Sequence, residues 1–534
     1  MGFMRDGNTA RALPYPEPEF PDKGTEVSPS PAPEQPHHTV RLQRTDWVIA
    51  AVLTLSVGMA CLFIADMIPA FLLQSMDFWF ESDTVREVSN MTSTTDDHSR
   101  TSVHPLFSIL TFVPVYLVKH ALAIPPLQAV LYVTSILGGL WMGTLYLLLR
   151  LLGCRTLDAC VFTSLGLSSA SAIFWLPVPN SYTWGSWSIM ISLALLLLAE
   201  QHRVGALSYV LASAFTLSIT VTNWMAGLLT TLARWPFKQA VQLSINAFCL
   251  VVLLWGAQKF IFPSAEFFIG SRKEANWINH PQSGQASNIA SSFVFHTLIA
   301  PAIRFIDDDG YIQVGDDSVR LAQRLAFQFS TPGSAGPLGL IAVCLWSALL
   351  LNGLWRLVTM DRQLRFRLVL ATLLLFELSL HMVYGEETFT YSLNFTPLLI
   401  ALAALGTLSP GRPAVLVLAG LLALCAVINN WQQFRQATES ATHFTPQRDA
   451  MTSLMQKDPD RPWPRSVGHI PLAVPGAPEA EHAYHEPGGD FSPQAPSFGV
   501  SLWLCDAEGR PLVTSQSVPL QDIQQTFEPS THPH

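Results

Sequence analysis

Charged residues are scarce in this chain. Of its 534 residues only 13% are Asp, Glu, Lys or Arg, whereas 49% are hydrophobic. None of the seven cysteines forms a C-x-x-C pair, so the sequence supports neither a disulfide framework nor a zinc site. A net charge of −9 argues against a nucleic-acid partner, which would be bound by an excess of Lys and Arg. These shortages favour a membrane protein.

Long apolar runs recur between Trp47 and Asn430. A helix needs about 20 apolar residues to cross roughly 30 Å of hydrocarbon, and many of the runs approach or reach that length. The sequence therefore predicts an all-α polytopic membrane bundle of about eleven spans. The expected spans are 47–69, 126–150, 157–175, 184–200, 205–221, 224–233, 240–262, 336–357, 367–384, 391–409 and 412–430.

Basic residues recur in alternate connections between these spans. They lie at Arg41 and Arg44, at 150–155, at Arg203, at 234–238, at 356–367 and at Arg412, whereas the opposite loops "LPVPNSY" and "YGEETFT" contain none. By the positive-inside rule we expect a cytoplasmic N-terminus and an outer C-terminus. The Ala/Leu/Pro-rich composition favours a bacterial inner (plasma) membrane.

This orientation requires that the segment 104–124 does not cross the membrane. Pro105, Pro114 and Lys119 interrupt it as a span, and we expect a juxtamembrane helix at the outer surface. If it crossed, the arginine-bearing loop at 150–155 would move outside and the charge rule would fail from there on.

The chain divides into three expected parts. Residues 1–45 are rich in Pro and in acidic and small polar residues, and predict a disordered cytoplasmic tail without the apolar run of a signal peptide. Residues 46–431 form the transmembrane domain, with outer loops at 70–125 and 263–335. Residues 432–534 predict a small β-rich soluble module on the outer side, because "FGVSLWLCDAEGRPLVTS" alternates about a turn.

The first outer loop collects ionisable groups. Residues 77–107 include six acids, two arginines and two histidines. Asp83 follows "FWF", interpreted as an aromatic belt at the head groups, and Arg86 shares its helix face. Asp83 is suited to take a proton from an attacking hydroxyl or amine. Arg86, Arg100 and His104 are suited to bind a lipid-linked phosphate. The alternative for any one of them is a solvated acidic surface.

Further candidates lie in this loop and in two others. Arg272 and Lys273 in "GSRKEANW" would bind the same phosphate or anchor the loop to lipid head groups. Glu386 and Glu387 are the only charges of their loop, so we expect a partner from elsewhere, either Arg86 or Arg100, or a sugar hydroxyl. The predicted substrate-binding residues are Asp96, Asp97, His98, Glu386, Glu387 and Tyr391. Tyr391 also suits an interfacial aromatic belt.

Two motifs receive a structural interpretation. Glu377 and His381, four apart within one span, are candidates as intramembrane ionisable residues, but a self-contained pair is favoured. The stretch "RFIDDDGYIQVGDD" lacks the glutamate of an EF-hand and predicts an acidic turn. No cofactor and no metal ligands are assigned, and whether a divalent metal takes part stays open because no spacing supports one.

The motif Asp83-x-x-Arg86 after the first span, followed by "HPLF", resembles the GT-C superfamily of membrane glycosyltransferases. Its members include the protein O-mannosyltransferases and the lipid A aminoarabinose transferases. The resemblance covers about residues 47–430, with "SD" and "HPLF" where relatives often have Asp-Glu and "HPPL". It implies transfer of a sugar from a polyprenyl-phosphate donor to a lipid, glycan or protein acceptor on the outer (periplasmic) side, with Asp83 as general base.

The alternative function is a polytopic lipid or glycan transporter or flippase, in which the same charges would line a translocation path. Transporters usually show internal repeats and broken helices near the middle of the membrane, and neither is evident here. A third class, a membrane anchor that displays the C-terminal module, leaves the ionisable first loop without a role.

Overall fold

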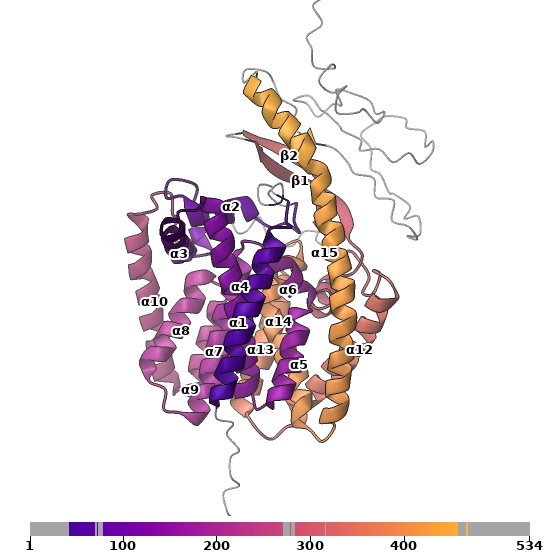
Figure 1. Ribbon diagram of the computed structural model, residues 1–534. Helices are drawn as coiled ribbons and strands as arrows, with labels where there is room; N and C mark the ends of the chain where they lie inside the picture. The colour runs from indigo at the N-terminus through magenta and orange to yellow at the C-terminus, as the bar shows by residue number, and fades with distance from the viewer. Residues whose placement is uncertain are drawn as a thin grey trace, which may run out of the picture. The chain divides into compact units, whose positions relative to one another are not determined.

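The computed structural model describes residues 42–69, 72, 78–270, 278, 284–314, 317–457 and 466–467 (Figure 1). Seven helical segments in these ranges are long and apolar enough to cross a membrane, which indicates an integral membrane protein. They are α1 (Arg44–Ala65), α4 (Pro126–Leu151), α7 (Ser181–Gln201), α10 (Phe237–Lys259), α12 (Pro337–Thr359), Thr388–Leu408 and the first part of α15 (Arg412–Lys457).

The remaining elements connect and cover these segments. The helices are α2 (Thr84–Thr92), η2 (Ser99–Ser102), α3 (Phe107–Leu122), α5 (Thr156–Leu167), α6 (Ala170–Trp175), α8 (Ala206–Ile219), α9 (Trp224–Arg234), α11 (Ala286–Ser291), η5 (Ser292–His296) and α13 (Leu364–His381). The segment Thr388–Leu408 consists of η6 (Thr388–Tyr391), α14 (Ser392–Ala404) and η7 (Leu405–Leu408). Four expected spans fall on α5 with α6, α8, α9 and α13, so the count of eleven stays a prediction.

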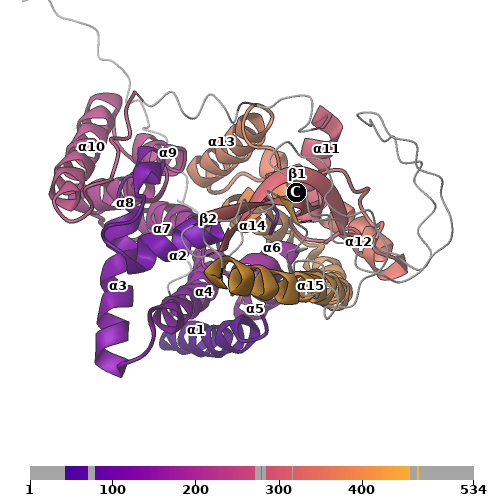
Figure 2. The same cartoon turned by 90° about the horizontal axis from the view of Figure 1, so that it is seen from above.

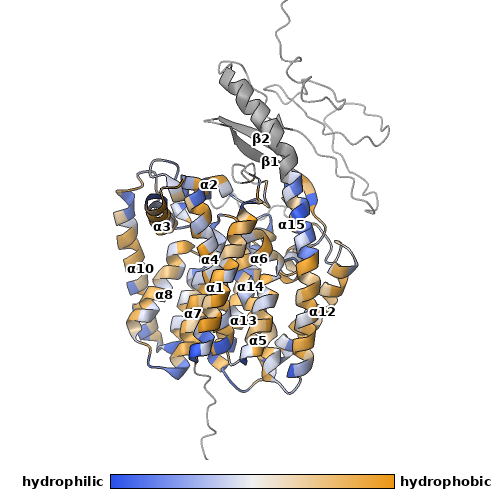
Figure 3. Ribbon diagram, in the orientation of Figure 1, coloured by the Kyte–Doolittle hydropathy of each residue, from blue (hydrophilic) through white to orange (hydrophobic). Residues whose placement is uncertain are grey.

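The bundle has a buried centre and an apolar outer surface. Every residue of α14 is buried, and Figure 2 shows this helix among the others. Apolar side chains such as Leu55 on α1 and Leu253 on α10 are exposed instead. Figure 3 shows hydrophobic residues along the long helices and hydrophilic ones gathered toward the ends. This distribution suits helices that face lipid.

Small residues let α1 and α4 approach closely. A Cβ added at Gly139 would overlap the carbonyl oxygen of Thr54, and one at Gly143 would overlap the Thr54 hydroxyl. Glycines four apart on one face allow this backbone contact, which is typical of helix pairs in membranes.

The expected arginine-rich connections meet at one end of the bundle. Arg150, at the end of α4, pairs at 2.7 Å with Asp46 at the start of α1. Arg412, at the start of α15, pairs at 2.6 Å with Asp158 at the start of α5. In Figure 1, α2, α3 and the β-hairpin lie at the opposite end. The basic connections and the ionisable first loop are therefore separated by the length of the bundle.

Helix α3 lies across the bundle axis. Figure 1 shows it nearly end-on, whereas Figure 2 shows it along its length. Its last turn carries Lys119 and His120, and it is shorter than the spanning helices. This placement agrees with the expected juxtamembrane helix.

The aromatic "FWF" segment does not form a lipid-facing belt. Phe78, Trp79 and Phe80 are fully buried. The ring of Phe80 lies 4.7 Å from that of Phe327 and 5.1 Å from that of Phe389. The segment is thus part of the core, because the hairpin and the α13–α14 loop cover it.

The second outer loop contains a β-hairpin where an acidic turn was expected. β1 (Arg304–Val314) pairs antiparallel with β2 (Asp317–Ala326), and a register shift lies between Asp307 and Gly310. The short strand β3 (Ser466–Val467) pairs parallel with β2.

Helix α15 continues through the expected boundary of the soluble module at 432. Phe434 and Ala437 are buried, so the residues just after 431 still pack against the bundle. Earlier in the helix, the Asn430 amide donates to the carbonyls of Ser168 and Leu298 at 2.7 Å each. The β-hairpin expected at 498–515 and the disordered tail expected up to residue 41 lie outside the described residues.

The buried pair at the end of α4 provides a test of the fold. Asp46→Ala leaves Arg150 buried without its carboxylate, a change that typically costs about 3–5 kcal/mol. We expect the Tm of the detergent-purified protein to fall by several degrees. Glu439→Ala breaks an exposed pair with Arg435, worth about 0–1 kcal/mol, and should leave the Tm nearly unchanged. Equal losses in both variants would contradict the assignment.

Labelling of single cysteines tests the orientation. In a cysteine-depleted variant, Leu117→Cys on the exposed face of α3 should react with an impermeant reagent from the outside only, or be shielded by lipid. Arg203→Cys, in the connection between α7 and α8, should react from the cytoplasmic side. Labelling of Leu117→Cys from the cytoplasmic side alone would reverse the interfacial assignment and the direction of the later spans.

Candidate functional site

A cavity of about 280 Å³ lies at the end of the bundle that carries α2 and α3. Five stretches of chain contribute to its wall: the first loop, η2 with the residues after it, the start of α7, the α8–α9 connection, and the end of α13 with the loop and helix that follow. Its polar lining residues are Glu81, Asp83, Glu87, Arg100, Ser102, His104, Tyr182, Thr220, Thr222, Glu377, His381, Tyr384, Glu386, Tyr391 and Asn394. Acidic, basic and aromatic side chains thus share one hollow.

Asp83 and Arg86 lie together as the i, i+3 spacing predicts. Asp83 is the N-cap of α2 and forms an ion pair with Arg86 one turn later. Asp83 lines the cavity, whereas Arg86 lines a small adjoining hollow that also includes Arg100 and His104. The guanidinium therefore holds the Asp83 carboxylate in its ionised form, with Arg100 nearby on the same side.

His104 lines the cavity as a neutral ring. Its Nδ1 lies 2.9 Å from the carbonyl oxygen of Ile219, so Nδ1–H donates and Nε2 is left as an acceptor. Burial lowers the pKa of His104 to about 3, and the nearby Arg100 lowers it further. The expectation of a cationic His104 at the phosphate does not match this state. Arg100 is the cation of this part of the wall.

The other predicted residues of the first loop are not among the cavity-lining residues. Asp97 accepts hydrogen bonds from the backbone N–H and the hydroxyl of Ser99. Asp96 accepts from Ser89 at 2.5 Å. His98 is fully buried, with Nδ1 2.8 Å from the Ser108 hydroxyl, and burial lowers its pKa. All three make contacts within the loop or its supporting shell.

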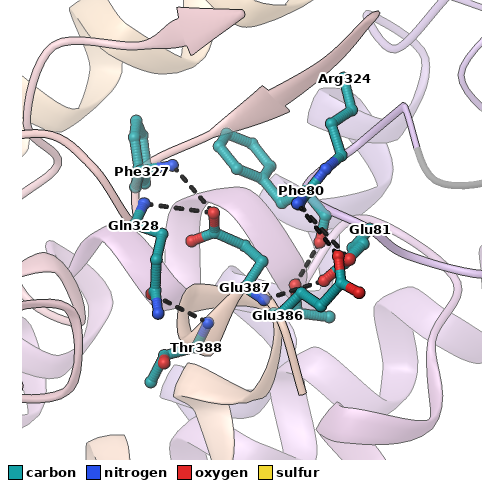
Figure 4. Close-up of polar contacts among 9 residues, drawn as sticks. Phe80, Glu81, Arg324, Phe327, Gln328, Glu386, Glu387 and Thr388 are labelled. Atoms are coloured by element: carbon teal, nitrogen blue, oxygen red, sulfur yellow. Dashed lines mark hydrogen bonds and ion pairs between the residues drawn. The ribbon is translucent and has the colours of Figure 1, made fainter. Parts of the chain in front are cut away.

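Glu386 and Glu387 have different surroundings. Glu386 lines the cavity, and one of its oxygens lies 3.5 Å from the Arg324 guanidinium. Glu387 is fully buried, and its Oε2 accepts hydrogen bonds from the backbone N–H groups of Phe327 and Gln328 (Figure 4). The expected basic partner, Arg86 or Arg100, is wrong for Glu386, because β2 brings Arg324 there.

Tyr391 lines the cavity with its ring 4.8 Å from that of His381. Its ring also approaches Gly385, which has a φ of +87° and where a Cβ would lie 2.9 Å from the tyrosine. Only glycine suits both conditions. His381 in turn lies 3.7 Å from Glu377, so the expected i, i+4 pair forms, but it faces the cavity instead of being self-contained.

Three cavity residues were not predicted: Glu81, Glu87 and Tyr182. A further unpredicted residue, Arg324, contacts two of the lining carboxylates. The density of acids in the first loop was a signal for Glu81 and Glu87, but it did not distinguish them from their exposed neighbours. Arg324 carried no signal, since its partners lie far away in the chain. Arg272 and Lys273 lie outside the described residues, as does the loop they belong to, apart from Ile278.

Within the described ranges, no group of three His, Cys, Asp or Glu residues is placed to hold a metal ion. In comparisons with known proteins, no protein-family model matches the chain, and no curated protein matches it. Inference about function therefore depends on the site itself.

Glu387 predicts a pH dependence of stability. Burial raises its pKa to about 7, against the lowering effect of Arg324 and of three backbone N–H groups. The folded protein holds this proton at a pH where the unfolded chain has lost it. The resulting stabilisation is complete below the ordinary pKa near 4.5 and declines as the pH rises to about 7.

Glu387→Gln should remove this contribution. The amide keeps an oxygen for the two backbone donors and does not titrate, so the fall in Tm between pH 5 and pH 8 should become shallower than in the wild type. Glu439→Gln, at an exposed site, should keep the wild-type slope. An unchanged slope in Glu387→Gln would show that its carboxyl is already ionised across this range.

Proposed function

We propose that this protein is an integral membrane glycosyltransferase of the GT-C type. It transfers a sugar from a polyprenyl-phosphate donor to a lipid, glycan or protein acceptor on the outer side of a bacterial inner membrane. The observation that carries the proposal is the shared cavity, in which the Asp83 carboxylate and the Arg100 guanidinium both take part in the wall at one end of an apolar bundle.

The reaction needs a base and a place for the leaving phosphate. The acceptor oxygen attacks the anomeric carbon, the bond from that carbon to the phosphate oxygen breaks, and the acceptor proton passes to Asp83. Arg100 stabilises the charge that develops on the leaving phosphate. Arg86 acts through Asp83 and from the adjoining hollow. Glycosyl transfer of this kind requires no further cofactor.

The position of the cavity favours a transferase over a transporter. Its charged residues gather at one end, while α14 at the centre of the bundle is buried along its whole length. A transporter usually binds its substrate near the middle of the membrane, at broken helices. The proposed topology has eleven crossings, a cytoplasmic N-terminus and an outer C-terminal segment, in keeping with the basic residues at the opposite end.

Asp83→Asn tests the general base. Asparagine is nearly the same size but does not accept the proton, and a general base typically contributes about 10²–10⁴-fold to rate. We expect folding and binding of a polyprenyl phosphate to persist, and transfer of labelled sugar from polyprenyl-phosphate donors to fall at least about a hundredfold.

Asp96→Asn and Asp97→Asn are the matched controls, since both acids lie in the same loop and neither is among the cavity-lining residues. Their transfer rates should stay close to the wild type. Normal transfer by Asp83→Asn, with loss in a control, would move the base along the loop. If none of the three matters, the transporter alternative gains support.

A further inference from the structure

Two cavity carboxyls from distant parts of the chain lie side by side. Glu81 belongs to the first outer loop and Glu386 to the α13–α14 loop, and their carboxyls are hydrogen-bonded to each other. The guanidinium of Arg324, on β2, lies 3.6 Å from a Glu81 oxygen and 3.5 Å from a Glu386 oxygen (Figure 4). The group thus joins three outer segments within one wall.

A hydrogen bond between two carboxyls requires a proton, because ionised carboxylates only accept. Burial raises the pKa of Glu81 well above its ordinary value, Arg324 opposes this, and Glu386 and Glu387 add to it. Two adjacent carboxyls of this kind titrate as a pair, which retains one proton after the first ionisation. In that state the pair carries one negative charge, and Arg324 balances it.

The wall around this pair is suited to a neutral ligand with hydroxyl groups. It offers one O–H donor and several acceptor lone pairs without excess charge. The rings of Tyr182, Tyr384 and Tyr391 line the same cavity and provide apolar faces beside polar groups, as in many small-molecule sites. An ammonium group would meet the like charge of Arg324, and a carboxylate would meet the anionic pair.

Glu87 independently indicates a ligand in this cavity. It lines the cavity, its residue is only 7% exposed, and its Oε2 has no hydrogen-bond partner within the described part of the chain. An unsatisfied buried polar atom is costly, so a hydroxyl group bound in the cavity gains from supplying the missing partner.

We propose that Glu81 and Glu386 form a subsite for an uncharged sugar ring, and that Arg324 is the positioning residue that holds the pair. One carboxyl donates a hydrogen bond to a ring hydroxyl and the other accepts one. The identity of this ring as the glycosyl group of the donor rests on the proposed function. The subsite therefore assigns a neutral sugar, in preference to an amino sugar or a uronic acid, to the reaction.

Binding measurements on the purified full-length protein test the subsite without turnover. The probes are a polyprenyl monophosphate, its glucose monoester, and the corresponding esters of an amino sugar and of glucuronic acid. We expect wild type to bind the glucose ester at least about tenfold more tightly than the bare lipid phosphate, from one or two hydrogen bonds to a charged pair. The two charged sugars should show a smaller gain.

Glu386→Ala should abolish most of this gain and leave the affinity for bare lipid phosphate unchanged. Asp97→Ala, an acid of the first loop away from the cavity lining, should keep the gain. A full gain in Glu386→Ala, or tighter binding of a charged sugar ester, would overturn the subsite while the transferase proposal stands. Failure of wild type to bind the lipid phosphate would overturn the proposed function and this inference with it.

The pH dependence of the gain separates a shared proton from a merely structural pair. In wild type the gain should fall as the pH rises, because loss of the shared proton removes the donor. Glu81→Gln supplies an amide donor at every pH and keeps an oxygen for the Glu387 backbone N–H, which Glu81 accepts at 2.8 Å. Its gain should persist and become independent of pH. A wild-type pH profile in Glu81→Gln would overturn the proposal.

Arg324→Gln tests the positioning residue through the same profile. The charged or titratable groups around the pair are Arg324 on β2, Glu387 on the α13–α14 loop, and Asp83 and His381 on the cavity wall. Without the guanidinium the pair loses its proton less readily, so the fall in gain should move to higher pH, and Arg324→Lys should restore part of the shift. An unmoved profile would remove Arg324 from this role.

Discussion

The outer end of the bundle depends on one buried guanidinium. Arg324 is only 3% exposed, and a buried cation is stable only when it is paired and hydrogen-bonded. Its carboxylate partners come from the first loop and from the α13–α14 loop. Because neither partner can move away without leaving this charge unpaired, the hairpin strand β2 and both loops are held in a fixed relation.

Packing and backbone hydrogen bonds reinforce the same junction. The backbone N–H of Leu325 donates to the carbonyl of Phe78 at 2.9 Å, and Glu387 accepts from the next two residues of the hairpin end. The rings of Phe80, Phe327 and Phe389 form a cluster beside it. This apolar cluster excludes water from the charged group, which strengthens the ion pairs and raises the cost of leaving any member unpaired.

Four acids that look alike in the sequence take different roles because their environments differ. Asp83 is ionised beside Arg86 at the cavity. Glu87 is buried one turn later, and burial raises its pKa. Asp97 is exposed and caps a local turn. Glu387 serves as an acceptor for backbone donors. Chemistry at the cavity thus arises from contrasts in solvation and pairing, and the apolar bundle below acts as the rigid support.

The sequence by itself determined the features that depend on local pattern. Runs of apolar residues identified the long helices, since crossing hydrocarbon requires length and low polarity. Alternation of Arg-rich connections separated the two ends. Proline and lysine in 104–124 marked α3 as a helix that does not span. The three-residue spacing of Asp83 and Arg86 led to their ion pair. These are properties of short segments, and they survive whatever surrounds them.

Only the tertiary structure decided which ionisable groups share a cavity. Glu81 and Arg324 are more than two hundred residues apart in the chain, and no spacing rule relates them. Burial of "FWF", the neutral state of His104 and the separation of Glu386 from Glu387 all follow from which segments pack together. Partners distant in sequence supply the desolvation and the charges that set protonation, so composition and periodicity carry no record of them.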